Sequence, residues 1–188
     1  MAARRSARQL VEVGQLVGPD LKGGDRVPRG EYGGNDRIQV FDDQGRYLFK
    51  FGSFGSEPGQ FNRPQGLDFD AASGALYVAD AVNHRISVHE PDGTLRRIVG
   101  TAGRSPGQLA YPYDVQVLPG GSLLVSEFGN NRVQILTPDG APQWTFGRVG
   151  TRPGEVRYPW GAVATEREIF VLDSGNNRVQ VVPMPDVQ

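Results

Sequence analysis

Residues 130–135 read Asn-Asn-Arg-Val-Gln-Ile, and this hexapeptide decides the fold because close copies of it recur along the chain. The copies are Asn35-Asp36-Arg37-Ile38-Gln39-Val40, Asn83-His84-Arg85-Ile86-Ser87-Val88 and Asn176-Asn177-Arg178-Val179-Gln180-Val181. Their arginines are 48, 47 and 46 residues apart. Self-similarity at such a period indicates a repeat architecture.

Further elements recur in phase with the hexapeptide. In chain order, the first three copies are each followed by a turn signal: Asp43-Gln44-Gly45, Pro91-Asp92-Gly93 and Pro138-Asp139-Gly140. A third element is Pro58-Gly59-Gln60-Phe61, then Pro106-Gly107-Gln108-Leu109, then Pro153-Gly154-Glu155-Val156, each with a proline soon after it (Pro64, Pro112, Pro159). Four phased signals make coincidence implausible.

Each repeat reads as short strands separated by turns. The clearest one predicts strands over 66–70, 75–79, 85–89 and 95–99, rich in β-branched residues and bounded by Gly, Pro, Asn and Asp. A four-stranded unit of about 45 residues is typical of a β-propeller blade. The sequence therefore predicts an all-β fold, a β-propeller of four-stranded antiparallel blades.

The phased pattern of apolar strand, Asp, Asn-[His/Asn]-Arg-[Ile/Val]-Gln-Val, Pro-Asp-Gly and Pro-Gly-Gln-Phe resembles the NHL repeat, over residues 35–182. The resemblance implies a β-propeller, most often with six blades. The family includes substrate-recruiting and RNA-binding ends of tripartite-motif ubiquitin ligases, bacterial extracytoplasmic sensor or scaffold domains, and a peptide-amidating lyase. It thus implies a fold strongly and a function weakly.

The repeats divide as about 35–61, 62–109, 110–156 and 157–182, followed by a tail over 183–188. Residues 1–34 show no hydrophobic periodicity, so we expect a poorly ordered segment in which Arg29–Gly34 replaces a repeat strand. The prediction is thirteen strands, an open arc of three to four blades, or about 3.3 of the usual six. Three explanations of the small number of blades remain open: the chain is a fragment or has a displaced start, two copies close the propeller as a homodimer, or another partner stabilises the arc.

Composition excludes several classes of function. The chain has no Cys, two His and a net charge of −1. The absence of Cys excludes disulfides, thiol nucleophiles and Cys-ligated zinc. Two histidines exclude a three-His metal site, and the net charge excludes a dominant basic field for nucleic acid. No apolar run approaches the roughly 18 residues of a membrane span. We predict no metal and no cofactor, and the sequence offers no catalytic residue.

Residues present in every repeat are framework candidates, since a catalytic site needs its chemistry only once. An acid ends the second strand, an Asn suits the turn, and an Arg begins the third strand, where a charge-assisted hydrogen bond is expected. A ring of arginines facing a ligand is the alternative. The framework residues are Asp80, Asn83, Arg85, Glu127, Asn130, Arg132, Asp173, Asn176 and Arg178.

The informative positions are those at which the repeats differ. Around the repeated proline, large aromatic or polar side chains occupy equivalent places near one mouth of the expected channel. They serve either as blade-to-blade packing or as a binding face for a base, a sugar or a peptide. Arg104, Arg148, Arg152 and Arg157 add a basic component in the loops between repeats. The candidate binding residues are Arg63, Gln65, Tyr111, Tyr113, Tyr158 and Trp160.

The leading functional hypothesis is a non-enzymatic scaffold that binds protein or peptide through its inter-blade and second-to-third-strand loops. Single-stranded RNA binding by the same face is the alternative, and a lyase- or lactonase-like enzyme is disfavoured. The start of the chain is a poor secretory signal, so the chain as written predicts a cytoplasmic protein. A longer start carrying a signal would make it extracytoplasmic.

Overall fold

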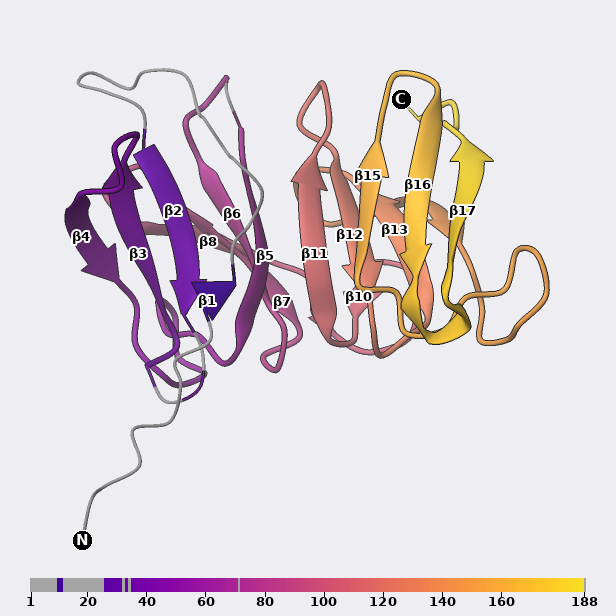
Figure 1. Cartoon of the computed structure of the whole chain (residues 1–188), viewed down its shortest axis with the longest axis horizontal. Coiled ribbons are helices and arrows are strands. Elements are labelled where there is room, and N and C mark those ends of the chain that lie inside the picture. Colours follow the sequence, from indigo (N-terminus) through magenta and orange to yellow (C-terminus); the bar gives the residue numbers. More distant parts are fainter. Residues whose placement is uncertain (1–9, 12–25, 32, 34, 71, 188) are drawn as a thin grey trace, which may run out of the picture.

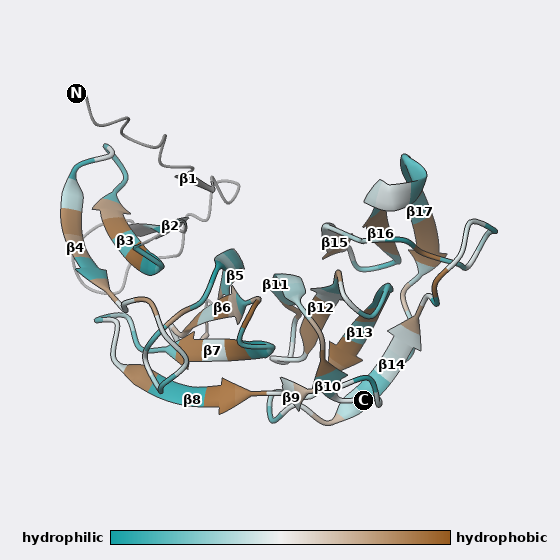
Figure 2. Ribbon diagram, turned by 90° about the horizontal axis from the view of Figure 1, so that it is seen from below, coloured by the Kyte–Doolittle hydropathy of each residue, from teal (hydrophilic) through white to brown (hydrophobic). Residues whose placement is uncertain are grey.

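Four antiparallel sheets stand side by side and follow an arc that is open on one side (Figure 1, Figure 2). This computed structural model describes residues 10–11, 26–31, 33, 35–70 and 72–187. Each sheet is formed by strands consecutive in the sequence, because turns of a few residues allow only neighbouring antiparallel pairing. We number the sheets as blades 1 to 4.

The strands of each blade are paired in chain order. Blade 1 contains β1 (Leu10–Val11), β2 (Arg26–Glu31), β3 (Arg37–Asp42) and β4 (Tyr47–Phe51). Blade 2 contains β5 (Pro64–Phe69), β6 (Leu76–Asp80), β7 (Arg85–His89) and β8 (Leu95–Val99). Blade 3 contains β11 (Pro112–Val117), β12 (Leu123–Glu127), β13 (Arg132–Leu136) and β14 (Pro142–Phe146), and blade 4 contains β15 (Gly161–Ala164), β16 (Glu168–Asp173) and β17 (Arg178–Pro183).

Two smaller elements lie outside this pattern. The short strands β9 (Thr101–Ala102) and β10 (Gln108–Leu109) pair in parallel within the loop between blades 2 and 3. A single turn of 3₁₀ helix, η1 (Ser174–Asn176), joins β16 to β17. Among the described residues, no helix has the length and apolarity needed to cross a membrane. The prediction of an all-β arc of four-stranded antiparallel blades is confirmed.

Blade 1 corrects one sequence-based expectation. Strand β2 pairs with β3 along its whole length, in the register Glu31↔Arg37 to Arg26↔Asp42. The expectation that residues 29–34 replace a repeat strand is therefore wrong for residues 29–31. Glu31 precedes Arg37 by six residues, whereas the acid precedes the Arg by five in the later repeats, and this extra residue hid the match. Within 1–34 the structure describes only residues 10–11, 26–31 and 33, so the prediction of poor order for the rest of this segment lies outside the described residues.

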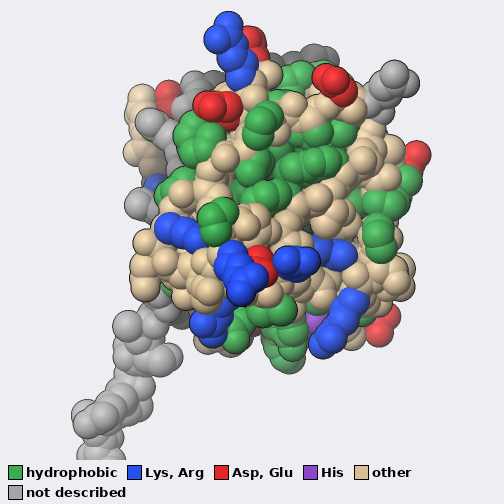
Figure 3. Space-filling view, turned by 90° about the vertical axis from the view of Figure 1, so that its right-hand side faces the viewer, with side chains coloured by type: hydrophobic (Ala, Val, Ile, Leu, Met, Phe, Trp, Pro, Cys, Tyr) green, Lys and Arg blue, Asp and Glu red, His purple; other side chains and the backbone are tan. Residues whose placement is uncertain are grey.

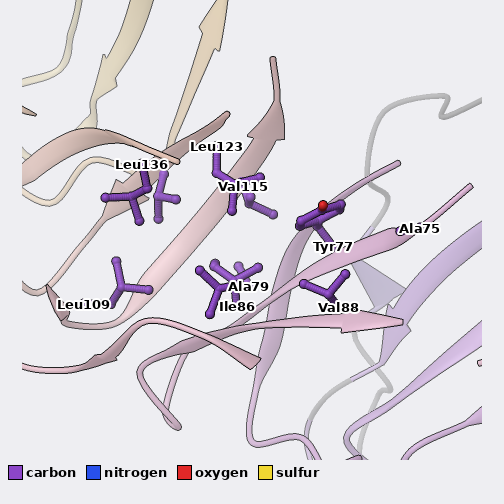
Figure 4. Packing of buried hydrophobic residues seen from close by; sticks show 11 residues of the cluster. Ala75, Tyr77, Ala79, Ile86, Val88, Leu109, Val115, Leu123 and Leu136 are labelled. Carbon is purple, nitrogen blue, oxygen red and sulfur yellow. The ribbon is translucent and has the colours of Figure 1, made fainter. Parts of the chain in front are cut away.

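Apolar side chains fill the space between neighbouring blades. Between blades 2 and 3, Tyr77 and Ile86 lie on the face opposite Val115 and Leu123 (Figure 4). These side chains alternate along their strands, so each blade contributes one face to the preceding interface and the other to the following one. The two further clusters join blades 1 and 2, and blades 3 and 4.

The innermost strands are linked across the blades by polar side chains. Asp68 of β5 accepts a hydrogen bond from the backbone N–H of Val117 in β11 at 2.6 Å. Gln116 of β11 accepts one from Ala164 of β15 at 2.7 Å. The sequence places these residues 48 apart, so one device is used at successive blade junctions.

Candidate binding rim

A buried carboxylate organises the turn between the second and third strands of each blade. In blade 3, Glu127 is fully buried and accepts hydrogen bonds from the Ala110 backbone N–H and from the side chains of Asn130, Arg132 and Gln134, at 2.6–2.9 Å. Asp80 and Asp173 accept equivalent bonds from their own Asn and Arg partners. In blade 1, Glu31 accepts bonds from Asn35, Arg37 and Gln39.

The arginine of this cluster also holds the loop that leads into its blade. Arg132 Nη1 donates to the Arg104 carbonyl at 2.8 Å, and Nη2 donates to the carbonyls of Ser105 and Gln108 at 3.0 and 2.9 Å. Arg85 and Arg178 hold the loops of blades 2 and 4 in the same way. All three guanidinium nitrogens of each arginine therefore bond within the blade, which favours the framework hypothesis over a ring of arginines facing a ligand.

A second repeated device sets the position of the rim side chains. Tyr111 and Tyr158, the residues before Pro112 and Pro159, adopt positive φ values of 48° and 49°. The Tyr111 N–H donates to His84 Nδ1 at 3.0 Å, and the Tyr158 N–H donates to Asn131 Oδ1 at 2.9 Å. Each acceptor is itself a turn residue of the preceding blade with positive φ.

Blade 2 repeats this link, since the Arg63 N–H donates to Asp36 Oδ1 at 2.7 Å. Arg63 has a φ of 59°. A left-handed conformation is costly for bulky residues, and the hydrogen bonds between blades hold these residues in it. The links lie at the lower end of the molecule in Figure 1, where β11 begins and β12 ends. We call this end of the molecule the rim.

An aromatic ladder crosses three blades at the rim. Tyr113 stacks on Phe128 with ring centroids 4.5 Å apart and an interplanar angle of 18°, and Phe128 stacks on Tyr158 at 4.8 Å and 23°. An arginine lies at each end, with Arg63 Cζ 5.6 Å from the Tyr113 ring and Arg157 Cζ 5.7 Å from the Tyr158 ring. The ladder consists of Arg63, Tyr113, Phe128, Tyr158 and Arg157.

The structure brings together some, but not all, of the candidate binding residues. Arg63, Tyr113 and Tyr158 join the ladder. Tyr111 contacts His84 edge-on at 4.5 Å, and it remains 42% exposed. Trp160 is 60% exposed, and none of the ring contacts among the described residues involves it. Gln65 is half-buried, and its side-chain nitrogen is buried without a hydrogen-bond partner.

Phe128 is the ladder residue that the sequence analysis missed. It occupies the position after the repeated acid, where the second and fourth repeats have Ala81 and Ser174. The same comparison of repeats that singled out Tyr113 would have found it. Its central place in the ladder depends on the distance between neighbouring blades, which cannot be read from the sequence of one repeat.

A carboxylate on the innermost strand of blade 3 lies close to two neighbouring backbones. Asp114 accepts a hydrogen bond from Ala162 N–H at 3.3 Å. A Cβ on Gly66 would lie 2.4 Å from Asp114 Oδ1 and 2.7 Å from Asp114 Cα, so glycine is required there, and one on Gly161 would make a tight contact of 3.0 Å with Oδ2. Burial, together with the charge of Asp68, raises the pKa of Asp114 to about 6.

Metal-ligating side chains do not gather in the part of the chain that the structure describes. No three His, Cys, Asp or Glu residues among them converge on a common point. The groups present at the rim are therefore aromatic rings, tyrosine hydroxyls and arginine guanidinium groups, and the rings and guanidinium groups of the ladder contact one another.

Comparison with known proteins identifies the repeat. The family model described as the NHL repeat matches residues 61–88 and 156–182. The chain carries NHL repeats. Over 72 residues it is 39% identical to the protein named brain tumor of Drosophila melanogaster, an alignment that covers 38% of this chain and 7% of that protein.

Solved structures with similar folds include other propellers of unlike function. A structure of a nidogen/laminin complex matches with a TM-score of 0.64 and 22% identity, covering 84% of this chain and 55% of the other. A streptogramin B lyase matches with a TM-score of 0.53 and 16% identity, covering 84% and 51%. The chain thus spans about half the length of these structures, and at such identities the likeness shows the fold alone.

Proposed function

We propose that this arc of NHL repeats is a non-catalytic interaction module that binds protein or peptide segments at its rim. The observation that carries the proposal is the aromatic ladder, which concentrates three stacked rings and two arginines at one end of three consecutive blades. Aromatic residues and arginine are enriched at the centres of protein interfaces. The remaining proposed binding residues, Gln65, Tyr111 and Trp160, stand directly before or after the same repeated proline as the ladder residues Arg63, Tyr113 and Tyr158.

The stacking of the ladder favours a peptide over RNA. Base stacking needs an open ring face, but Phe128 has a ring stacked on each side, and Tyr113 and Tyr158 each lie between Phe128 and an arginine. The ring edges and the exposed Trp160 remain to contact a partner. Such a surface suits the side chains and backbone of a peptide that lies across the rim.

A selection from a phage-displayed peptide library on the whole chain tests this proposal. Peptides selected on the wild type should lose at least about tenfold in affinity for Tyr113→Ala and Trp160→Ala. Tyr47→Ala is the matched control, because Tyr47 is 52% exposed and begins β4, at the end of blade 1 opposite the rim. Circular dichroism should be the same for all variants.

Two outcomes contradict the proposal. Selected peptides that bind Tyr113→Ala, Trp160→Ala and the wild type equally would remove the rim as the binding surface. Tight retention of a random single-stranded RNA pool in filter binding at low salt, lost in Trp160→Ala, would assign the rim to RNA.

A further inference from the structure

The hydrogen bond that links blades 2 and 3 at the rim differs in chemistry from the links on either side of it. The acceptor is Asp36 Oδ1 between blades 1 and 2, and Asn131 Oδ1 between blades 3 and 4. Between blades 2 and 3 it is His84 Nδ1, which lies 3.0 Å from the Tyr111 backbone nitrogen. Histidine is the side chain whose charge ordinarily changes between pH 5 and 8, so this junction alone of the three has an acceptor of that kind.

The link requires one particular state of the His84 imidazole. A ring nitrogen accepts a hydrogen bond through its lone pair, so Nδ1 carries no proton and the neutral ring holds its proton on Nε2. Protonation would turn Nδ1 into a donor directed at another donor, the Tyr111 N–H. Proton uptake at Nδ1 and the link between the blades therefore exclude each other.

The link holds a strained residue. Tyr111 has a φ of 48°, a left-handed conformation that is costly for a bulky side chain. Its ring contacts the His84 ring edge-on, with centroids 4.5 Å apart. It also packs closely on the turn of its own blade, because a Cβ on Gly129 would lie 2.8 Å from Tyr111 Cδ2. His84 thus supplies both the acceptor for the Tyr111 backbone and one wall for its ring.

Tyr111 connects His84 to the aromatic ladder. The Phe128 N–H donates to the Tyr111 carbonyl at 3.0 Å, so the two residues share a backbone contact across blade 3. Phe128 in turn stacks on Tyr113, which follows Tyr111 by two residues. A change in the backbone of Tyr111 therefore acts on two of the three stacked rings.

The carboxylates closest to this turn are already engaged. The charged or titratable side chains in the surrounding segments, 62–63, 80–85, 110–111 and 127–132, are Arg63, Asp80, Arg85, Tyr111, Glu127 and Arg132. Both carboxylates are fully buried and bond the Asn and Arg of their own blade. On the blade 4 side of the molecule, Lys and Arg side chains gather toward the rim end (Figure 3). A proton on His84 thus adds positive charge without a new ion pair.

We propose that His84 is a pH-sensitive latch of the rim. When neutral, it holds Tyr111 in the left-handed conformation across the junction of blades 2 and 3. When protonated, it loses the acceptor lone pair and releases Tyr111, so that acid loosens the rim beside the ladder. The latch is a property of the chain itself, and its test needs no ligand.

Nuclear magnetic resonance of the whole chain between pH 8 and pH 5 tests the latch. The Tyr111 amide proton should move upfield as its hydrogen bond is lost, with the same midpoint as the signals of the His84 ring. The Tyr158 amide is the internal control, because it makes the equivalent bond to the amide oxygen of Asn131, and it should move much less.

Two variants exchange the acceptors between junctions. His84→Asn gives blade 2 the acceptor that blade 3 has, and the Tyr111 amide should then no longer follow pH. Asn131→His transfers the latch, so the Tyr158 amide should titrate instead. The chain already uses both residue types at this turn position with positive φ, so circular dichroism at pH 8 should match the wild type.

Urea denaturation measures the energetic effect. Between pH 8 and pH 5 the folding equilibrium constant of the wild type should fall about fivefold relative to that of His84→Asn, since one hydrogen bond is lost. The comparison with His84→Asn cancels the effects of other groups that titrate in this range, among them the buried Asp114 and His89.

Two results would overturn the proposal. One is a Tyr111 amide that stays in place while the His84 ring takes up its proton. The other is a Tyr111 amide that follows pH equally in His84→Asn and in the wild type, because another group would then be the cause. Should His84→Asn fail to fold, the wild-type titration and Asn131→His still decide between these outcomes.

Discussion

Blades 3 and 4 carry nearly the same third strand, Arg-Val-Gln-Ile-Leu in β13 and Arg-Val-Gln-Val-Val in the first five residues of β17, yet the two strands have different surroundings. All five residues of β13 are buried, whereas exposure alternates along β17. The apolar residues of β13 are covered by blade 4 and by β14. Those of β17 have no such neighbour among the described residues, so an identical local pattern produces a core in one blade and an exposed face in the next.

The polar clusters show the same contrast between a covered and an open blade. The side chain of Arg132 is 10% exposed and that of Arg178 is 29% exposed, although both acids are fully buried. In blade 2, burial raises the pKa of Asp80. At Asp173, burial acts in the same direction, but hydrogen bonds from Arg157 N–H, Asn176, Arg178 and Gln180 outweigh it and lower the pKa.

The largest expected effect on stability tests the comparison between β13 and β17 directly. Val133→Asp places a charge in a fully buried interface, and we expect the loss of more than about 4 kcal/mol or a failure to fold. Val179→Asp, at the equivalent exposed position, should change the free energy of unfolding by less than about 0.5 kcal/mol. Urea denaturation of the two variants measures both values. Similar losses in both would show that the outer face of β17 is covered in solution.

The carboxylate clusters should differ in the same direction. Glu127→Ala leaves the Arg132 guanidinium buried without its charge partner, which should cost about 3 to 5 kcal/mol. Asp173→Ala should cost about 1 to 3 kcal/mol, because the more exposed Arg178 recovers water contacts. Urea denaturation at pH 7 compares them. An equal cost would mean that hydrogen bonds within the blade, and not solvent access, set the stability of the cluster.

Asp114 predicts a pH dependence at the junction of blades 2, 3 and 4. Its pKa of about 6 in the folded chain exceeds the unfolded value of about 3.9, so the folded state binds the proton more tightly. Its contribution to stability is complete below about pH 4 and is lost as the pH rises through about 6. Asp114→Asn removes this loss and should stabilise the chain by up to about 2 kcal/mol at pH 8.

The pH profile supplies the control for this prediction. Near pH 4, Asp114→Asn and the wild type should unfold at the same urea concentration, because both carry a neutral side chain at this position. A constant difference between them from pH 4 to pH 8 would assign the effect to packing against Gly66 and Gly161.

The smallest expected effect on stability concerns Ser126, a buried residue of β12 in blade 3. The Ser126 hydroxyl is buried without a hydrogen-bond partner, and the equivalent residue in blade 2 is Ala79. Ser126→Ala should therefore stabilise the chain by about 1 kcal/mol, since it removes an unsatisfied polar group. Thermal unfolding measures this gain, and a loss of stability would indicate that the hydroxyl has a partner in solution.

Much of the fold could be predicted because each repeat carries its own turn chemistry. The Asn-X-Arg turns, the Pro-Asp-Gly turns and the alternation of Leu76 and Val78 specify strands without reference to distant residues. The prediction was wrong at 29–31 because one added residue between Glu31 and Arg37 displaced the acid from its usual place. Strand β2 forms nevertheless, since β3 offers an edge with which it can pair.

The candidate rim could be predicted only in part. Sequence comparison selected Arg63, Tyr113 and Tyr158 because they differ between repeats. It did not select Phe128, and it did not separate Trp160, which is exposed, from the stacked rings. Stacking between Tyr113, Phe128 and Tyr158 depends on the distance between blades.

The sequence by itself determined the repeat, the order of the strands and the acid–Asn–Arg clusters, because these rest on contacts between residues close together in the chain. Only the tertiary structure decided which of the repeated apolar faces are buried among the described residues and which aromatic rings stack. Burial and stacking depend on neighbours in other blades, so equivalent residues such as Val133 and Val179 acquire opposite surroundings.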